Sequence, residues 1–420
     1  MNKFLLISGV VLSSVLHGQA VSSYQDRVNL IKQDSIIKFN TELVNIGVKK
    51  SGSTQNANAL AYLTKKYKDF GYTASQITND TYKVFTTGDS KSIIVTKTGT
   101  TYPNEYVIIC GHYDTFSTTG SNISVGANDN ESGVSAILEI ARILKDVPTE
   151  YSIKFINFSG EEQGLYGSKS YVSQVVNATN PKMKIRLVFN LDQVGGMANK
   201  VNNTVTCEAD RFVDELGTVH TAGTKTTNDA ASLAFTNSLV QYVGYYSSLT
   251  GALNYAYSSD YIPFENNGEI ITGFYERPTS SATINTNYNN NNVVSNTYYH
   301  NNTDTIANLS YPYLFQITKS ALGAMQHFSV ASISGTLHSV DTTIDVNEFF
   351  IHPNPAKDFI NLLLDSKVKN YGFEISDMSG QLISKTKNKE RISVSSLKPG
   401  VYIGTLDFNN KKTSKKFIVR

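Results

Sequence analysis

Histidine and carboxylate side chains follow short apolar runs in this sequence. His112 comes one residue after EYVIIC, and the adjacent pair Glu161 and Glu162 comes two residues after SIKFINF. Asp192 directly follows RLVFNL, and Asp129 precedes a stretch with helical periodicity. Neutral imidazole and carboxylate oxygens suit zinc and similar divalent ions. Carboxylates gathered at one place repel one another unless cations neutralise them, so the pattern favours a metal centre.

Two of the seven histidines stand among other ligand types. One is His112, and the other is His300, which lies in a loop rich in tyrosine and asparagine. A single histidine is more often structural than a metal ligand. The neighbouring acids reverse that balance for His112, whereas His300 depends on the resemblance described below. The other five are assigned to the leader, a helix end, the closing helix, the linker and the last domain: His17, His220, His327, His338 and His352.

Other roles for the acidic residues stay open at this point. Adjacent glutamates are usually a solvated surface pair, although Glu161 and Glu162 follow an apolar run and precede glycines. A glycosidase also needs two carboxylates, about 5–10 Å apart. That interpretation leaves His112 without a role. Asp129 could be a helix N-cap, and Asp192 could be a turn residue.

The elements that must position these residues alternate between strands and helices. Buried strands are predicted for residues 105–110, 152–158 and 186–191, and helices for residues 130–144, 167–176 and 311–330. This alternation predicts an α/β fold, with a mixed, mainly parallel β-sheet flanked by helices. Chemistry in such sheets collects beyond the carboxyl ends of the strands, which is where the candidate residues fall.

Length and composition exclude several classes of protein. The chain has 420 residues, enough for two or three domains. With 40% hydrophobic and 17% charged residues, it is neither a disordered acidic tail nor a collagen-like fibre. A net charge of +2 gives no reason to expect nucleic-acid binding. Two cysteines exclude a disulfide scaffold and a four-thiolate zinc site, and whether Cys110 and Cys207 form a disulfide stays open.

The first 20 residues have the layout of a secretory signal peptide. Lys3 precedes an apolar stretch over residues 4–16, and the small residues Gly18 and Ala20 close the segment. Cleavage is expected after Ala20. A membrane anchor is the alternative, but the apolar stretch is too short to span a bilayer. The mature chain is therefore expected to leave the cytoplasm without an integral membrane segment.

The remaining chain divides by composition and charge. Residues 346–420 carry 13 Lys and Arg against 7 Asp and Glu, whereas residues 21–345 carry 23 against 28. Short strand candidates separated by turns predict a small all-β sandwich over residues 346–420. Small and polar residues indicate a linker over residues 331–345, which leaves residues 21–330 as the domain that contains the candidate metal ligands.

Six motifs occur in a familiar order: CGHYDT, GANDNESG, FSGEEQGLYGS, FNLDQVG, SDYIPF and YYHNNTDT. Together they resemble the co-catalytic zinc aminopeptidases of the bacterial leucyl aminopeptidase type, over roughly residues 50–330. The resemblance implies a secreted metallopeptidase with two Zn²⁺ ions that removes N-terminal residues from peptides or proteins with a free N-terminus. Water activated by zinc would be the nucleophile.

The resemblance also implies a role for each ligand. His112 and Asp192 would hold one zinc, Glu162 and His300 would hold the other, and Asp129 would bridge the two. The peptide bond between Asp129 and Asn130 would be cis, as in the family.

Further residues take supporting roles by the same resemblance. Glu161 would be the general base, and Asp114 would accept the other ring N–H of His112 and fix its tautomer. Tyr299 matches a position that steadies the oxyanion in some members.

The substrate pocket is where this chain departs from the family pattern. The motif SDYIPF has Tyr261 where many relatives have histidine, while Asp260 and Phe264 match. These residues, with Tyr275, are the candidate pocket walls.

Three alternatives remain beside the aminopeptidase. A glutaminyl cyclase shares the fold but uses one zinc for acyl transfer, a binding module of this fold would lack the metals, and a carboxypeptidase uses the same metal pair. The presence of all five ligands favours hydrolysis.

The last 75 residues have a resemblance of their own. FFIHPNPAKDFINLLL, ISDMSGQLI and LKPGVYIGTL resemble the type A sorting domain of type IX secretion. Residues 346–420 would then be recognised by the outer-membrane secretion machinery, which delivers the protein outside the cell or to its surface. A carbohydrate-binding or adhesion sandwich is the alternative.

Overall fold

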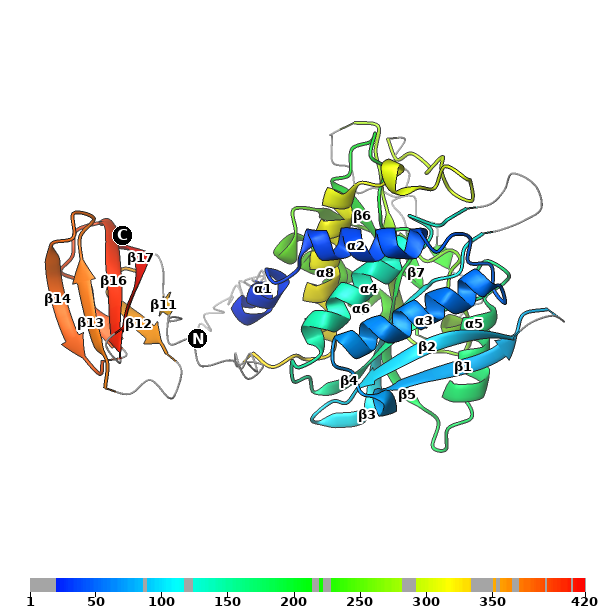
Figure 1. Ribbon diagram of the computed structural model, residues 1–420, viewed down its shortest axis with the longest axis horizontal. Helices are drawn as coiled ribbons and strands as arrows, with labels where there is room; N and C mark the ends of the chain where they lie inside the picture. Colours follow the sequence, from blue (N-terminus) through cyan, green and yellow to red (C-terminus); the bar gives the residue numbers. More distant parts are fainter. Residues whose placement is uncertain are drawn as a thin grey trace, which may run out of the picture. The chain divides into compact units, whose positions relative to one another are not determined.

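The computed structural model describes residues 20–85, 89–116, 124–213, 219–221, 228–281, 292–333, 350–352, 356–364, 370–389, 391–408 and 411–419. The chain separates into two compact units, Met1–Leu337 and His338–Arg420 (Figure 1). Residues 1–19 of the predicted signal peptide and residues 334–345 of the predicted linker lie outside the described residues.

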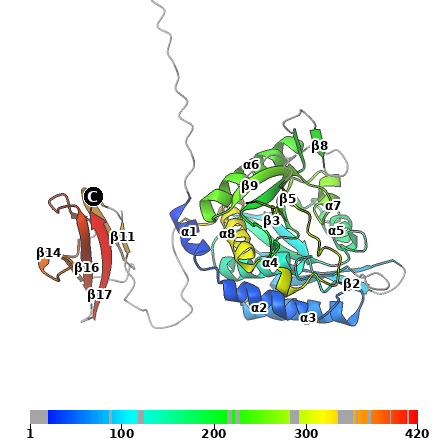
Figure 2. The ribbon, with the colours of Figure 1, turned by 90° about the horizontal axis from the view of Figure 1, so that it is seen from above.

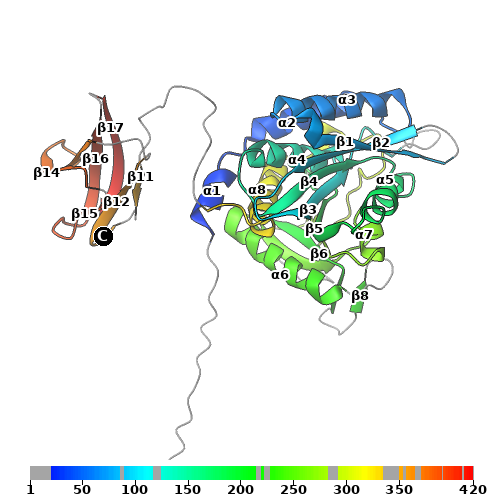
Figure 3. The same cartoon turned by 90° about the horizontal axis from the view of Figure 1, so that it is seen from below.

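An eight-stranded mixed sheet forms the centre of the first unit. In order across the sheet its strands are β1 (Ile77–Lys83), β2 (Asp89–Lys97), β4 (Tyr151–Phe158), β3 (Tyr102–His112), β5 (Lys184–Leu191), β10 (Ile271–Glu276), β6 (Thr204–Ala209) and β9 (Thr250–Tyr255). Figure 3 shows β4, β3 and β5 in this order, between β1 near α3 (Thr54–Asp69) and β6 beside α6 (Asp229–Tyr246). The four strands β4, β3, β5 and β10 are parallel to one another, as the sequence predicts for a mainly parallel sheet.

Helices cover both faces of this sheet. One core is shared by α3, α6 and four further helices, α1 (Ser22–Val28), α2 (Gln33–Val44), α4 (Glu131–Leu144) and α8 (Tyr311–Phe328). On the opposite face a second core is closed by α5 (Tyr166–Tyr171), the π-helical turn Val172–Val176 and α7 (Ile262–Asn266). Figure 2 shows α5 and α7 across the sheet from α8 and α1. Because apolar helices lie on both faces, central strands are continuous apolar runs.

Apolar periodicity and a capping residue explain why the predicted helix after Asp129 forms. In α4 the residues Val134, Ile137 and Leu138 recur at helical spacing and are completely buried. Its N-cap is Asn130, whose side-chain oxygen accepts a hydrogen bond from the Gly133 N–H at 3.0 Å. The helix predicted over residues 311–330 forms as α8 and ends at Phe328.

The parallel strands bring the candidate residues to one edge of the sheet. His112 is the last residue of β3, and Asp192 directly follows β5. Glu161 follows β4 after two residues, and Glu276 is the last residue of β10. Since neighbouring parallel strands end at the same edge, four sequence-distant segments deliver their polar side chains to one place.

Two details differ from the sequence interpretation or settle what it left open. His220 was expected to follow a helix, but it lies in a short strand β8 (Val219–Thr221) paired with β7 (Arg211–Val213). Cys110 and Cys207 are both buried free thiols rather than a disulfide.

Among the described residues no helix has the length and apolar character needed to cross a membrane.

The second unit is a small all-β domain. A three-stranded sheet contains β11 (Phe350–His352), β12 (Phe359–Leu363) and β15 (Arg391–Ser393); a four-stranded sheet contains β14 (Leu382–Lys387), β13 (Gly372–Ser376), β16 (Gly400–Phe408) and β17 (Lys411–Val419). All pairs within these sheets are antiparallel. Buried side chains such as Ile360, Phe373 and Phe417 form its core, as predicted for a sandwich.

Candidate metal centre

His112 faces two carboxylates from the end of β3. Its Nε2 atom lies 3.2 Å from Asp129 Oδ1 and 3.4 Å from Asp192 Oδ1. The imidazole is almost fully buried, at 1% exposure, so these oxygens replace water around it. Asp192 is held by a hydrogen bond of 2.6 Å from the Ser259 hydroxyl to its other oxygen, Oδ2. The oxygen Oδ1 is thereby left free to face the centre.

His300 faces the other oxygen of the Asp129 carboxylate. Its Nε2 atom lies 3.3 Å from Asp129 Oδ2 and 2.9 Å from Glu162 Oε2. Candidate ligand atoms from His112, Asp129 and Glu162 all lie within 4.8 Å of one another. The structure therefore brings together all five residues predicted as ligands, with Asp129 between the two histidines.

Two aromatic rings fix the orientation of His300. The Phe116 ring stacks on the imidazole with 3.8 Å between centroids and 4° between planes. The Tyr299 ring stacks at 3.6 Å and 26°. Tyr299 therefore lies directly against a candidate ligand, and the residue as a whole is 48% exposed. The sequence interpretation included Tyr299 but not Phe116.

Asp114 supports the centre differently from the prediction. The His112 Nδ1 atom is hydrogen-bonded at 3.1 Å to the backbone oxygen of Asp114, while the nearer carboxylate oxygen is 3.7 Å away. The carboxylate instead accepts the backbone N–H groups of Glu161 at 3.2 Å and Glu162 at 3.3 Å. The loop after β4 presents both N–H groups to this buried acid. Asp114 thus orients the Glu161–Glu162 segment, and its backbone orients His112.

Asp304 is a buried residue of the site that the sequence interpretation missed. Its Oδ1 accepts the backbone N–H of Asn128 at 2.7 Å, and its Oδ2 accepts that of Asp129 at 3.1 Å. The Asp129–Asn130 peptide bond is cis, as the resemblance implied. Asp304 belongs to the motif YYHNNTDT, so the motif contained a signal that was not interpreted.

Glu276, at the end of β10, is a second missed residue. Its Oε2 accepts hydrogen bonds from Asn128 Nδ2 at 2.9 Å and from the Gly196 N–H at 2.7 Å. The Asn128 Oδ1 in turn accepts the Gly195 N–H at 2.8 Å. This network ties the loop before α4 to the segment after β5. No motif in the sequence pointed to it.

Three of the four predicted pocket residues are buried beside the centre, whereas the fourth, Tyr275, is 38% exposed. Phe264 has no exposed surface and packs near Phe158, with 6.2 Å between ring centroids. Tyr261 is 1% exposed and donates its hydroxyl to Glu208 Oε1 at 3.2 Å. Asp260 is completely buried. Their role as walls of a substrate pocket stays a prediction.

Electrostatics at the centre is dominated by crowded acids. Burial, together with neighbouring carboxylates, raises the pKa of Glu161 and Glu162 well above the usual range. Burial would also raise the pKa of Asp129, but hydrogen bonds from His112 and His300 hold it at about 2. A site that concentrates negative charge out of water favours a cation.

The donor atoms fit zinc. They are imidazole nitrogens and carboxylate oxygens, the ligand types that zinc takes together with thiolates. The buried oxygens Glu162 Oε1 and Asp192 Oδ1 have no hydrogen-bond partner among the described residues. Unsatisfied buried acceptors facing a centre are what a bound cation would satisfy.

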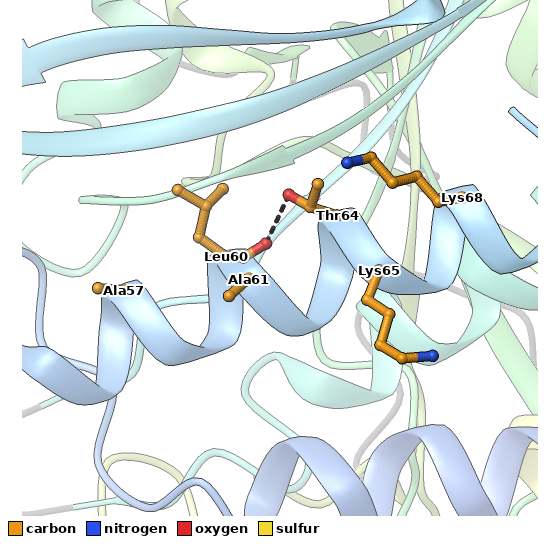
Figure 4. A pocket seen from close by; sticks show the side chains of 6 residues that line it. All are labelled: Ala57, Leu60, Ala61, Thr64, Lys65 and Lys68. Carbon is orange, nitrogen blue, oxygen red and sulfur yellow. Dashed lines mark hydrogen bonds between the residues drawn. The ribbon is translucent and has the colours of Figure 1, made fainter. Parts of the chain in front are cut away.

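A cavity elsewhere on the molecule contains none of these residues. It measures about 410 Å³ and is lined by one side of α3 (Figure 4). Its lining residues are Ala57, Leu60, Ala61, Thr64, Lys65 and Lys68. This lining contains no histidine and no carboxylate, so we do not assign this cavity to the metal site.

Comparison with known proteins matches both units. The profile of peptidase family M28 matches residues 92–325, and that of the secretion system C-terminal sorting domain matches residues 350–420. Aminopeptidase YwaD of Bacillus subtilis is 40% identical over 114 residues, 27% of this chain and 24% of that protein. A probable zinc metalloprotease of Pyrenophora tritici-repentis is 27% identical over 191 residues, 41% of this chain and 43% of that protein. The chain thus spans less than half the length of these curated relatives.

Solved structures share the fold. LapB from Legionella pneumophila superposes with a TM-score of 0.56 at 21% identity, over 74% of this chain and 75% of that one. A glutaminyl cyclase from Bacteroides thetaiotaomicron superposes with a TM-score of 0.52 at 17% identity, over 70% of this chain and 97% of that one. At these identities the likeness concerns the fold alone.

Proposed function

The chain belongs to peptidase family M28, and we propose that it is a secreted di-zinc aminopeptidase that hydrolyses N-terminal residues from peptides or proteins. One observation carries the proposal. The two carboxylate oxygens of Asp129 face two different histidines, His112 at 3.2 Å and His300 at 3.3 Å. A carboxylate between two imidazoles is the arrangement expected for a ligand shared by two metal ions.

The ligand set divides around that bridge. Asp192 joins His112 in one group, and Glu162 joins His300 in the other, each within 3.4 Å of its histidine. When bound, zinc supplies the Lewis acidity that polarises a scissile carbonyl and acidifies water. We assign one zinc to each group, with Asp129 shared between them.

The remaining chemistry belongs to side chains of this protein. Glu161 adjoins the ligand Glu162, and Asp114 fixes the backbone of both. The Glu161 carboxylate takes a proton from water and passes it to the leaving amine. The Tyr299 hydroxyl donates to the carbonyl oxygen as negative charge develops on it. Phe116 and Tyr299 both stack on the His300 ring, and this keeps the ring oriented toward Asp129.

Substrate choice and export complete the proposal. Asp260, Tyr261 and Phe264 shape the pocket for the N-terminal side chain from the buried layer beside the centre.

Residues 1–20 are the signal peptide and residues 21–330 the catalytic domain, followed by a linker over residues 331–345. The C-terminal unit matches a secretion sorting domain, which directs the protein out of the cell or to its surface. The partner for residues 346–420 is the type IX secretion machinery.

The experiment compares leucyl peptides with a free and with an acetylated amino group, using the mature chain from residue 21. Cleavage is measured before chelation, after chelation and after zinc is returned. We expect zinc-dependent release of leucine from the free-amine peptide alone. Cleavage that ignores acetylation indicates an endopeptidase or carboxypeptidase, and cyclisation of an N-terminal glutamine peptide without hydrolysis indicates a glutaminyl cyclase.

A further inference from the structure

The backbone at Val21 makes a specific contact far from the metal centre. Its N–H donates a hydrogen bond of 3.1 Å to the hydroxyl oxygen of Tyr246, the last residue of α6. Val21 is the N-cap residue of α1 and is half-buried. The two residues are 225 positions apart in the sequence, so the contact depends on the folded domain.

Tyr246 contacts His327, a histidine that has no part in the proposed catalytic mechanism. The Tyr246 hydroxyl oxygen lies 2.8 Å from His327 Nε2. The imidazole stacks on Tyr242 with 4.0 Å between centroids and 5° between planes, and the Tyr24 ring meets it edge-on. Burial lowers the pKa of His327 to about 4, so the ring is neutral, and in the tautomer with its proton on Nδ1 the Nε2 atom accepts the Tyr246 O–H. In either tautomer the Tyr246 oxygen keeps a lone pair that accepts the Val21 N–H.

Helix α1 is fixed in the position that makes this contact. The Arg27 guanidinium donates to Gln326 Oε1 at 3.1 Å and to the Ser332 backbone oxygen at 2.7 Å. The Tyr24 hydroxyl donates to the Ala331 backbone oxygen at 2.6 Å. Both Arg27 and Tyr24 are buried. These bonds hold α1 against the end of α8 and leave little freedom to the residue just before it.

The sequence places the expected signal-peptide cleavage between Ala20 and Val21. Hydrolysis of that peptide bond adds water, leaving a carboxylate on Ala20 and an amino group on Val21 that takes up a proton. We propose that Tyr246, supported by His327, is the binding site for this terminal ammonium group in the mature protein. The site would convert a neutral amide contact into a charged one.

The energetic balance favours the charged contact. Hydrogen bonds from an ionised donor are shorter and stronger than those from an amide. The positive end of the α1 dipole opposes the charge, but α1 has only seven residues and Val21 keeps part of its contact with water. The terminus therefore gains a specific acceptor without the full penalty of burying a charge.

A consequence rests on the proposed function. An aminopeptidase takes a free amino terminus, and its own mature terminus is such a substrate. With its amine on Tyr246 and α1 pinned by Arg27, the terminus is withheld from its own active site and from other exopeptidases.

The test is a thermodynamic cycle on the mature chain carrying Glu161→Gln, so that no readout depends on the chain's own activity. Chains beginning at Val21 and chains with an acetylated Val21 are compared, each with and without Tyr246→Phe. We expect acetylation to lower the unfolding midpoint by about 2–4 °C when Tyr246 is present and by clearly less in the Tyr246→Phe background. Equal effects in the two backgrounds would overturn the proposal.

The matched control is Tyr245→Phe. This neighbouring hydroxyl bonds only weakly to the exposed Gln241 at 3.4 Å, so the effect of acetylation should persist in that variant. An effect lost equally in the Tyr245→Phe and Tyr246→Phe chains would speak against the assigned acceptor.

Two mass measurements complete the test. The protein exported by its own cell should begin at Val21, and any other first residue contradicts the site. Exposed to an unrelated aminopeptidase, the Tyr246→Phe chain should lose N-terminal residues several-fold faster than the chain with Tyr246. Equal trimming rates would overturn the proposal even if the protein proves to be an active aminopeptidase.

Discussion

Asp304 accepts the backbone N–H of Asp129 at 3.1 Å, and its other oxygen accepts the N–H of the preceding Asn128 at 2.7 Å. The buried Asp304 thus fixes the backbone of Asp129, the residue that lies between the two histidines. The position of the bridging carboxylate is set from behind by a residue that binds no metal in our proposal.

We expect Asp304→Asn to weaken the centre without removing a ligand. The amide keeps the size of the side chain but replaces one acceptor with a donor that faces a backbone N–H. Zinc affinity or activity should fall about 10–100-fold, the usual cost of disturbing the support of a metal ligand. Competition with a chelator measures the affinity. Unchanged affinity and turnover would show that Asp129 does not depend on Asp304.

Glu161→Gln should separate chemistry from metal binding. Glu161 is assigned as the general base and is not one of the proposed ligands, so turnover should fall about 10²–10⁴-fold while zinc content stays the same. Glu105→Gln is the matched control, because Glu105 lies toward the opposite end of β3 and pairs with Lys184 at 3.6 Å. Near-normal turnover with full zinc content in the Glu161 variant would remove it as the base.

Lys49→Met should destabilise the catalytic unit strongly. Lys49 Nζ lies 3.0 Å from Glu131 Oε1, and both side chains are completely buried. Removing the cation strands a buried carboxylate, which costs about 3–5 kcal/mol. Lys65→Met removes an exposed partner of Asp69 and should cost less than about 1 kcal/mol. Urea unfolding measures both, and similar losses for the two variants would refute the distinction.

His327 should make stability depend on mildly acidic pH. Its pKa is lowered by burial from an ordinary value of 6.5 to about 4, so the unfolded chain binds the proton more readily than the folded one. Its contribution is complete above about pH 6.5 and is lost as the pH falls toward about 4. The His327→Gln variant should lose less unfolding free energy than the parent between about pH 7 and pH 4.5. Parallel pH curves would contradict this assignment.

The sequence predicted the parts of the site that are carried by strand ends. Runs such as EYVIIC and RLVFNL identify buried strands by themselves, and parallel strands end together, so His112 and Asp192 could be expected at one edge. The second histidine could not be placed in this way. His300 reaches Asp129 from a loop with no periodicity, and only the resemblance linked the two.

The supporting contacts could not be predicted because they depend on exact backbone positions. Nothing in the sequence says that the Asp114 carboxylate accepts the N–H groups of Glu161 and Glu162 while its backbone oxygen holds His112. Glu276 joins the site because β10 inserts beside β5, a neighbour relation that chain order does not reveal. The all-β character of the C-terminal unit was readable, since its short strands and turns follow one another directly.

The most direct measurement is the number of zinc ions bound per active chain. We expect two ions in the mature protein, because Asp129 faces two separate ligand groups. We expect about one ion in the His300→Ala variant, which keeps His112 and Asp192, together with loss of aminopeptidase activity. A fully active parent protein with a single zinc, or a His300→Ala variant that still binds two, would contradict the two-metal centre.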